Sequence, residues 1–201
     1  MGLLLKENNM PKLVYINSCI RKEESRTLKI ATPIIEALKE KYDVLEVDVN
    51  SLELDVIDYE KYHKRMNGYV REDILDLAKR IADADRIVIA APFWDMSFPS
   101  KLKALFEQCS LFRITFADDG NGCYGLCKAD KVLYITTRGG NFPTGSEFEQ
   151  ATPYIKALFH LWGVKSLEVI DAYNMDYSSP EEIQEKIDSA IKQGLKLAET
   201  F

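Results

Sequence analysis

The sequence has no long apolar run and no cluster of basic residues. Its longest apolar runs have the length of strands, which excludes a membrane-spanning helix of the usual length. The formal net charge is −6, and this acidic balance argues against nucleic acid or an anionic membrane as the main partner. The first segment, Met1–Glu7, is too short and too soon charged to be a signal peptide. We therefore expect a cytoplasmic protein without a membrane partner.

Histidine and cysteine are scarce, and their spacing excludes the common structural zinc sites. The chain has two histidines and four cysteines, which are Cys19, Cys109, Cys123 and Cys127. Cys123 and Cys127 are spaced C-x3-C, and no Cys/His pair lies near them in the sequence. Without a secretory signal, the cysteines are expected to be reduced thiols in the cytosol. We predict no metal site.

Short apolar and β-branched runs alternate with helical patterns along the chain. The predicted strands are Leu13–Ile16, Val44–Val47, Arg86–Ala91, Lys131–Thr136 and Ser166–Ile170. Apolar residues at helical spacing predict helices near 28–38, 70–81, 102–109, 148–162 and 183–195, with Ser25 capping the first and Ser179-Pro180 beginning the last. This alternation predicts a doubly wound α/β fold. For five parallel strands the flavodoxin-like order 2-1-3-4-5 is expected, with helices on both faces.

The domain organisation follows from the same pattern. Residues 1–10 precede the first strand and are expected to be a frayed leader. Residues 11–201 are then a single domain of ordinary size. Residues 49–68 show no clear period, and residues 113–130 resemble a loop with three glycines.

An unusually apolar loop follows the third predicted strand. It contains, in order, Pro92, Phe93, Trp94, Asp95 and Met96. The fourth strand ends in a second loop, formed by Thr137, Arg138, Gly139 and Gly140. Ligands of open parallel sheets bind at such carboxyl ends of strands. We therefore expect the two loops to wall a flat aromatic ligand, although singly the aromatics could be ordinary core and the glycines a simple turn.

The segment after the first strand is rich in hydroxyl groups and leads into a helix. Ser18, Ser25 and Thr27 flank this helix start, where free N–H groups and the helix dipole favour an anion. The segment lacks both the G-x-G-x-x-G and the G-x4-G-K-[ST] fingerprint, so a terminal monophosphate fits better than a dinucleotide. The alternative is a plain N-cap at Ser25. A phosphate beside an aromatic wall suggests flavin mononucleotide (FMN).

These motifs resemble those of the FMN-dependent NADH azoreductases and quinone reductases with a flavodoxin-like fold. The resemblance rests on Ala90–Lys103, Thr136–Gly140, Thr152–Tyr154 and the hydroxyl-rich segment from Ser18 to Thr27. It implies that Phe93–Met96 and Thr137–Gly140 contact the flavin ring. It also implies that Cys19, Ser25, Arg26 and Thr27 hold the phosphate. The implied reaction is ping-pong hydride transfer from NADH or NADPH to FMN, followed by reduction of a quinone or azo compound.

The resemblance further implies a homodimer with the flavin sites at the subunit interface. The flavin performs the chemistry in this family, so we predict no catalytic side chain. The sequence departs from the family at two positions. Cys19 stands where a hydroxyl residue is usual, and it is expected to weaken one phosphate contact. Asp95 stands where Asn is usual, and its charge is expected to lower the flavin reduction potential.

Two other functions remain open from the residues. Cys19 followed by Arg26-Thr27 resembles the small cysteine phosphatases and arsenate reductases, but the spacing here is C-x6-R instead of C-x5-R-[ST]. A flavodoxin-like electron carrier without turnover is the second alternative. Carriers usually present a strongly acidic face, whereas the acidic residues at 53–60 are followed by the basic residues Lys61, Lys64 and Arg65.

Overall fold

The computed structural model describes residues 10–201. The predicted leader, residues 1–10, lies outside this range except for its last residue. The strands are β1 (Lys12–Asn17), β2 (Asp43–Asp48), β3 (Arg86–Ala90), β4 (Phe116–Asp118), β5 (Cys123–Gly125), β6 (Lys131–Thr137) and β7 (Ser166–Ala172). The α-helices are α1 (Arg26–Lys39), α2 (Tyr59–Met66), α3 (Glu72–Asp83), α4 (Ser100–Cys109), α5 (Ala151–Leu161) and α6 (Pro180–Ala198). Two short 3-10 turns are η1 (Lys22–Glu24) and η2 (Met175–Tyr177).

The main sheet has the order β2-β1-β3-β6-β7, and every neighbouring pair is parallel. Because β4 and β5 form a separate ribbon, this order is the predicted 2-1-3-4-5, which is confirmed. Strand β1 lies between β2 and β3, so β2 is added on one side of β1 and the later strands on the other. The strand order therefore reverses between β1 and β3, where ligands of such sheets bind. The segment after β1 is joined to the end of β3, since the Ser18 N–H donates to the Ala90 carbonyl at 2.8 Å.

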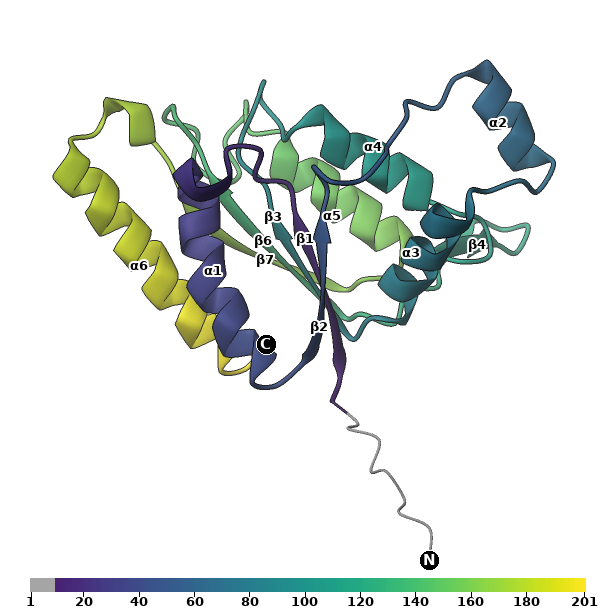
Figure 1. The fold of residues 1–201 in the computed structure, drawn as a ribbon, viewed down its shortest axis with the longest axis horizontal. Coiled ribbons are helices and arrows are strands. Elements are labelled where there is room, and N and C mark those ends of the chain that lie inside the picture. The colour runs from purple at the N-terminus through teal and green to yellow at the C-terminus, as the bar shows by residue number, and fades with distance from the viewer. Residues whose placement is uncertain (1–9) are drawn as a thin grey trace, which may run out of the picture.

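Helices cover both faces of the sheet (Figure 1). One apolar core joins α1 and α6 to one face, and it contains Leu13 and Tyr15 of β1. The other core joins α3, α4 and α5 to the opposite face, and it contains Val14 and Ile16. Successive residues of a strand point to opposite faces, so a strand buried on both sides must be apolar throughout. This is why β1 has an uninterrupted apolar centre.

The predicted helix termini are confirmed at three places. The Ser25 side chain accepts a hydrogen bond from the Leu28 N–H at 3.2 Å and caps α1. Ser179 and Glu182 form a reciprocal capping box at the start of α6, with Pro180 in the first turn. Gly163 follows α5 with a φ of 95°, a conformation that glycine adopts at little cost.

Two segments predicted to be irregular contain secondary structure. Residues 49–68 include α2, which buries none of its residues. A helix that buries no residue does not need apolar residues at helical spacing. The sequence therefore contains no periodic signal from which α2 could be predicted. Residues 113–130 include the β4–β5 hairpin, in which Gly120 and Gly122 provide turn residues with positive φ. The predicted start of the fourth helix was too early, because α5 begins at Ala151. Within residues 10–201, no helix is both long enough and apolar enough to cross a membrane.

Candidate functional site

A cavity of about 130 Å³ lies at the carboxyl ends of the central strands, where the loops after β1, β3 and β6 meet. Its lining is Arg21, Ser25, Arg26, Pro92, Phe93, Trp94, Thr137, Gly139 and Asp176. Seven of these nine residues belong to the site predicted from the sequence. The doubly wound topology thus brings together the three loops that the motifs singled out.

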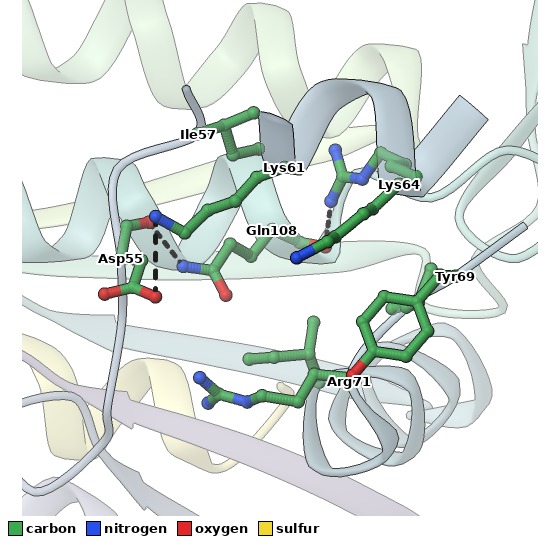
Figure 2. A pocket seen from close by; sticks show the side chains of 10 residues that line it. Asp55, Ile57, Lys61, Lys64, Tyr69, Arg71 and Gln108 are labelled. Atoms are coloured by element: carbon green, nitrogen blue, oxygen red, sulfur yellow. Dashed lines mark hydrogen bonds and ion pairs between the residues drawn. The ribbon is translucent and has the colours of Figure 1, made fainter. Parts of the chain in front are cut away.

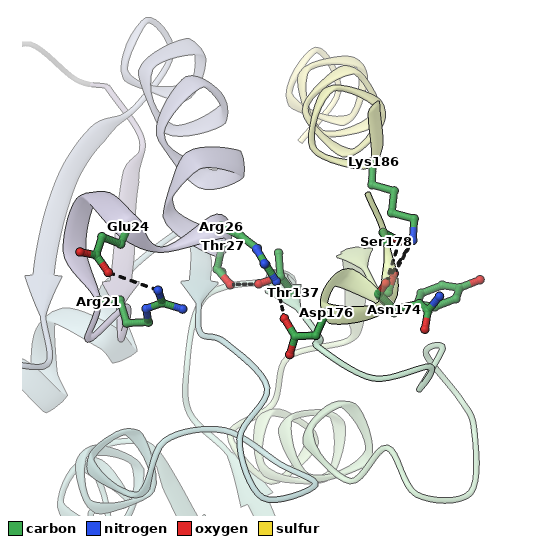
Figure 3. A network of polar contacts seen from close by, with 10 residues as sticks. Arg21, Glu24, Arg26, Thr27, Thr137, Asn174, Asp176, Ser178 and Lys186 are labelled. Atoms are coloured by element: carbon green, nitrogen blue, oxygen red, sulfur yellow. Dashed lines mark hydrogen bonds and ion pairs between the residues drawn. The ribbon is translucent and has the colours of Figure 1, made fainter. Parts of the chain in front are cut away.

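The start of α1 forms one end of this cavity. Ser25 is the N-cap and Arg26 is the first helical residue, so both lie where the helix dipole is most positive. The first N–H groups of a helix have no partner within the helix. Thr27 lies below the cavity, fully buried, and its hydroxyl contacts the Thr137 hydroxyl at 2.7 Å (Figure 3). This contact fixes α1 against the end of β6.

Cys19 lies behind the cavity and does not line it. Its side chain is only 2% exposed, and its Sγ lies 3.7 Å from the Ala90 carbonyl oxygen. Burial raises the pKa of the Cys19 thiol to about 11. A thiol that keeps its proton at neutral pH is a poor nucleophile. The geometry therefore gives no support to the phosphatase alternative.

The apolar loop makes a tight reversal beyond Trp94. Trp94 and Ser97 exchange backbone hydrogen bonds of 3.0 and 2.8 Å. The two residues between them, Asp95 and Met96, have φ values of 48° and 66°. These left-handed conformations cost energy for residues other than glycine, and such strain is concentrated at functional sites. Asp95 and Met96 are exposed on this turn and do not line the cavity.

Arg138 is fully buried, and its side chain points away from the cavity lining. Its guanidinium donates to Asp171 Oδ2 at 2.7 Å, to the Phe142 carbonyl at 2.8 Å and to the Thr144 hydroxyl at 2.8 Å. Its backbone N–H is also engaged, by the Ala172 carbonyl. The guanidinium carbon lies 5.7 Å from the centre of the Phe93 ring. Arg138 thus supports the aromatic wall from behind.

The two glycines after Arg138 permit close packing. A Cβ on Gly139 would overlap the Asp176 carboxylate, and one on Gly140 would overlap the Phe142 ring. Across residues 10–201, neither glycine N–H donates to another residue. The Gly139 N–H belongs to a cavity-lining residue and is free to bind a ligand there.

Two lining residues, Arg21 and Asp176, were not predicted. Arg21 is in the hydroxyl-rich segment, and its basic side chain between Cys19 and Ser25 was an available signal. Asp176 offered no signal, because it is 150 residues from its partner Arg26. Each is part of an ion pair: Arg21 contacts Glu24 at 3.2 Å, and Arg26 contacts Asp176 at 2.7 Å (Figure 3).

A second cavity, of about 200 Å³, lies under α2 (Figure 2). Four cations line it, but three already have carboxylate partners: Lys61 with Asp55 and Asp58, Lys64 with Glu60, and Arg71 with Asp73. Arg65 instead donates to the last carbonyls of α4, at Glu107 and Gln108. This cavity lies away from the three strand-end loops and contains none of the predicted ligand-binding residues.

Comparison with known proteins identifies the family. Residues 11–197 match the family described as "Flavodoxin-like fold". The chain belongs to this family. It is 32% identical to the FMN-dependent NADH:quinone oxidoreductase of Clostridium perfringens, over 96% of this chain and all of that protein. It is 28% identical to the FMN-dependent NADH:quinone oxidoreductase of Coprothermobacter proteolyticus, with the same coverage.

Solved structures of this flavodoxin-like family have the same fold. An azoreductase from Bacillus anthracis aligns with a TM-score of 0.83 at 20% identity, over 96% of this chain and all of that one. An FMN-dependent NADH-azoreductase from the same species, solved in complex with FMN, aligns with a TM-score of 0.78 at 21% identity, over 94% of this chain and all of that one. At these identities the likeness concerns the fold alone.

The residues that line the cavity have the chemistry that FMN requires. Two arginines and a helix start gather at one end, which suits a phosphate. Phe93 and Trp94 supply an aromatic wall, and Trp94 is 43% exposed. Gly139 lines the cavity, and its N–H has no partner within residues 10–201. The described part of the chain contains no group of three or more His, Cys, Asp or Glu residues that could hold a metal ion.

Proposed function

We propose that this protein is an FMN-dependent NADH oxidoreductase that reduces quinones or azo compounds. The observation that carries the proposal is the cavity in which a cationic helix start faces an aromatic wall. The names of the curated relatives support the same activity. NADH, named for those relatives, is the proposed electron donor.

When bound, FMN supplies the redox centre that exchanges a hydride with NADH and two electrons with the acceptor. The chain's own residues bind and orient that group. Ser25, Arg26 and the first turn of α1 hold the phosphate, while Phe93 and Trp94 lie against the ring. The Gly139 N–H would donate to the bound flavin and stabilise negative charge on it. Asp95, on the adjacent turn, opposes that charge and lowers the reduction potential.

We also propose that two copies of the chain form a homodimer in which each completes the other's flavin site. A cavity of about 130 Å³ falls below the roughly 300–1,000 Å³ of sites that enclose a ligand of this size. Trp94 and Met96 are 43% and 45% exposed beside it. Phe148 is also exposed, and it precedes Gln150, whose N–H donates to the Met96 carbonyl at 2.9 Å. A partner subunit would cover these apolar side chains and leave a slot for planar acceptors.

The four free thiols support a reducing compartment, the cytoplasm.

The first test is the visible absorption spectrum of the purified protein, followed by anaerobic addition of NADH. We expect flavin bands that bleach with NADH and return when a quinone is added. Continued NADH oxidation with excess quinone would distinguish the enzyme from an electron carrier. A colourless protein that does not bind added FMN would contradict the proposal. Sedimentation of the FMN-loaded protein as a monomer would contradict the dimer.

A further inference from the structure

The ion pair between Arg26 and Asp176 spans the phosphate end of the cavity. Arg26 is the first residue of α1, whereas Asp176 lies in η2, the short turn that follows β7. Arg26 Nη1 lies 2.7 Å from Asp176 Oδ1, and both residues line the cavity (Figure 3). Their side chains are 32% and 64% exposed, so a solute can reach both partners. Arg26 is the cation best placed to bind an anionic ligand, and it already forms an ion pair with Asp176.

The position of this carboxylate is built into the fold. Three consecutive N–H groups, of Asn174, Met175 and Asp176, donate to the carbonyls of the loop after β6, at 2.8 to 3.1 Å. Met175 between them is fully buried and anchors the turn. The Asp176 carboxylate lies over Gly139, in the space that a Cβ would need. Turn and loop therefore hold the acid at Arg26 before any ligand arrives.

The other ion pair at the cavity is of a different kind. Arg21 and Glu24 are three residues apart in one exposed segment, and Glu24 does not line the cavity. Such local, solvent-exposed pairs contribute little and exchange readily with water. Only the Arg26–Asp176 pair joins two distant elements across the lining. The two pairs therefore differ in what an incoming anion must displace.

We propose that Asp176 is a specificity-determining residue that competes with the flavin phosphate for Arg26. This inference rests on the proposed function. A phosphate at the start of α1 must share Arg26 with the carboxylate or displace it, and the two anions repel each other at close range. A small free anion has no other contact that would offset the free-energy cost of displacing the Asp176 carboxylate. A ligand that also places a ring on Phe93 and Trp94 has a second source of binding energy. Asp176 thus disfavours anions that have no ring to place on this wall, and it weakens the phosphate contact of those that have one.

The test compares the dissociation constants of FMN and riboflavin, which differ only in the phosphate. Flavin fluorescence titrations would use the wild-type apoprotein, Asp176→Asn and the matched control Asp188→Asn. Asp188 is a carboxylate on α6, outside the cavity lining. We expect Asp176→Asn to tighten FMN binding by about fivefold, the upper range for an exposed pair, and to leave riboflavin unchanged. The control should change neither constant.

A second experiment tests whether the effect of Asp176 on FMN binding depends on Arg26. In an Arg26→Gln background, the further change Asp176→Asn should no longer tighten FMN binding, because the contested cation is absent. Weaker FMN binding in Asp176→Asn would mean that the acid positions Arg26, and it would overturn the proposal. Equal shifts for FMN and riboflavin would also overturn it. If Asp176→Asn does not fold, Asp176→Ser is titrated in its place. A wild-type protein that binds neither flavin would instead refute the proposed function.

Discussion

At the scale of single residues, Arg138 shows how a predicted ligand residue can have a different task. The resemblance implied that the stretch Thr137–Gly140 contacts the flavin. In the structure the Arg138 side chain is fully buried and pairs with Asp171, 33 residues later. A second acid, Glu149, lies 3.9 Å from its Nη2 and is also fully buried. The sequence could not reveal this inward orientation, since the acids that decide it come from other segments.

Replacing Arg138 by methionine should strongly destabilise the protein. The variant keeps much of the side-chain volume but leaves two acids without their buried counter-ion. Breaking a buried ion pair from one side costs about 3–5 kcal/mol. Urea denaturation would measure the change in the free energy of unfolding. Arg80→Met is the matched control, because Arg80 forms an exposed i,i+4 pair with Asp76, and it should cost about 0.5 kcal/mol or less. A loss for Arg138→Met as small as the control's would contradict this role.

At the scale of elements, two helices begin with the same residue type in different surroundings. Ser25 caps α1 and lines the cavity, whereas Ser179 caps α6 and does not line it. Both caps were predicted from sequence alone, because a serine before an apolar-periodic segment is a local signal. What the local signal did not decide is which helix start faces a ligand.

The two caps provide a matched pair of variants. Ser25→Ala and Ser179→Ala should each lower the free energy of unfolding by about 1 kcal/mol, since each leaves a helical N–H without its acceptor. Only Ser25→Ala should also weaken FMN binding. Thermal unfolding and flavin titration would be run on both proteins. Equal FMN affinity in the two variants would remove Ser25 from the phosphate site.

Helix α2 is the α-helix of residues 10–201 that the sequence did not predict. It has no buried residue, and polar contacts made by residues within it and beside it attach it to the rest of the fold. Arg65 makes two of these, to the Glu107 and Gln108 carbonyls at 3.1 and 2.7 Å. An element with few buried apolar contacts opens locally at low free energy.

Hydrogen exchange should therefore find α2 the least protected of the helices within residues 10–201. In Arg65→Gln, exchange in α2 should become faster while exchange in α1 and α6 stays unchanged. The reason is that the substitution removes a local attachment and leaves both apolar cores intact. Exchange measured by mass spectrometry on peptides covering residues 55–71 would detect this. Equal acceleration in all helices would show that Arg65 contributes to global stability instead.

At the scale of the whole molecule, two apolar cores enclose thiols that the ligand-binding site does not use. Cys109 is fully buried and Cys127 is partly buried. Burial raises the pKa of each to about 12, and that of Cys19 to about 11, from 9.0. These thiols keep their protons in the folded state over a pH range where the unfolded chain loses them.

The free energy of unfolding should accordingly fall as pH rises above about 9. Below that pH the thiols are protonated in both states, so this contribution is complete and constant. Between about pH 9 and 11 only the unfolded state is deprotonated, and each group contributes a slope of up to about −1.4 kcal/mol per pH unit. Urea denaturation from pH 8 to 11 would measure it. Cys109→Ala should flatten the slope, whatever its effect at neutral pH, and an unchanged slope would contradict the assignment.

Local signals in the sequence were enough to predict the five parallel strands of the main sheet, their order, both serine caps and seven of the nine residues that line the cavity. These features follow from local periodicity, capping residues and the rule that ligands bind at the carboxyl ends of strands. The three-dimensional packing was needed to show that Arg138 and Thr27 are fully buried and that Asp176 pairs with Arg26. Each of these depends on side chains brought together from distant segments. Such contacts carry no periodic signal, because they are selected by packing in three dimensions and not by neighbours along the chain.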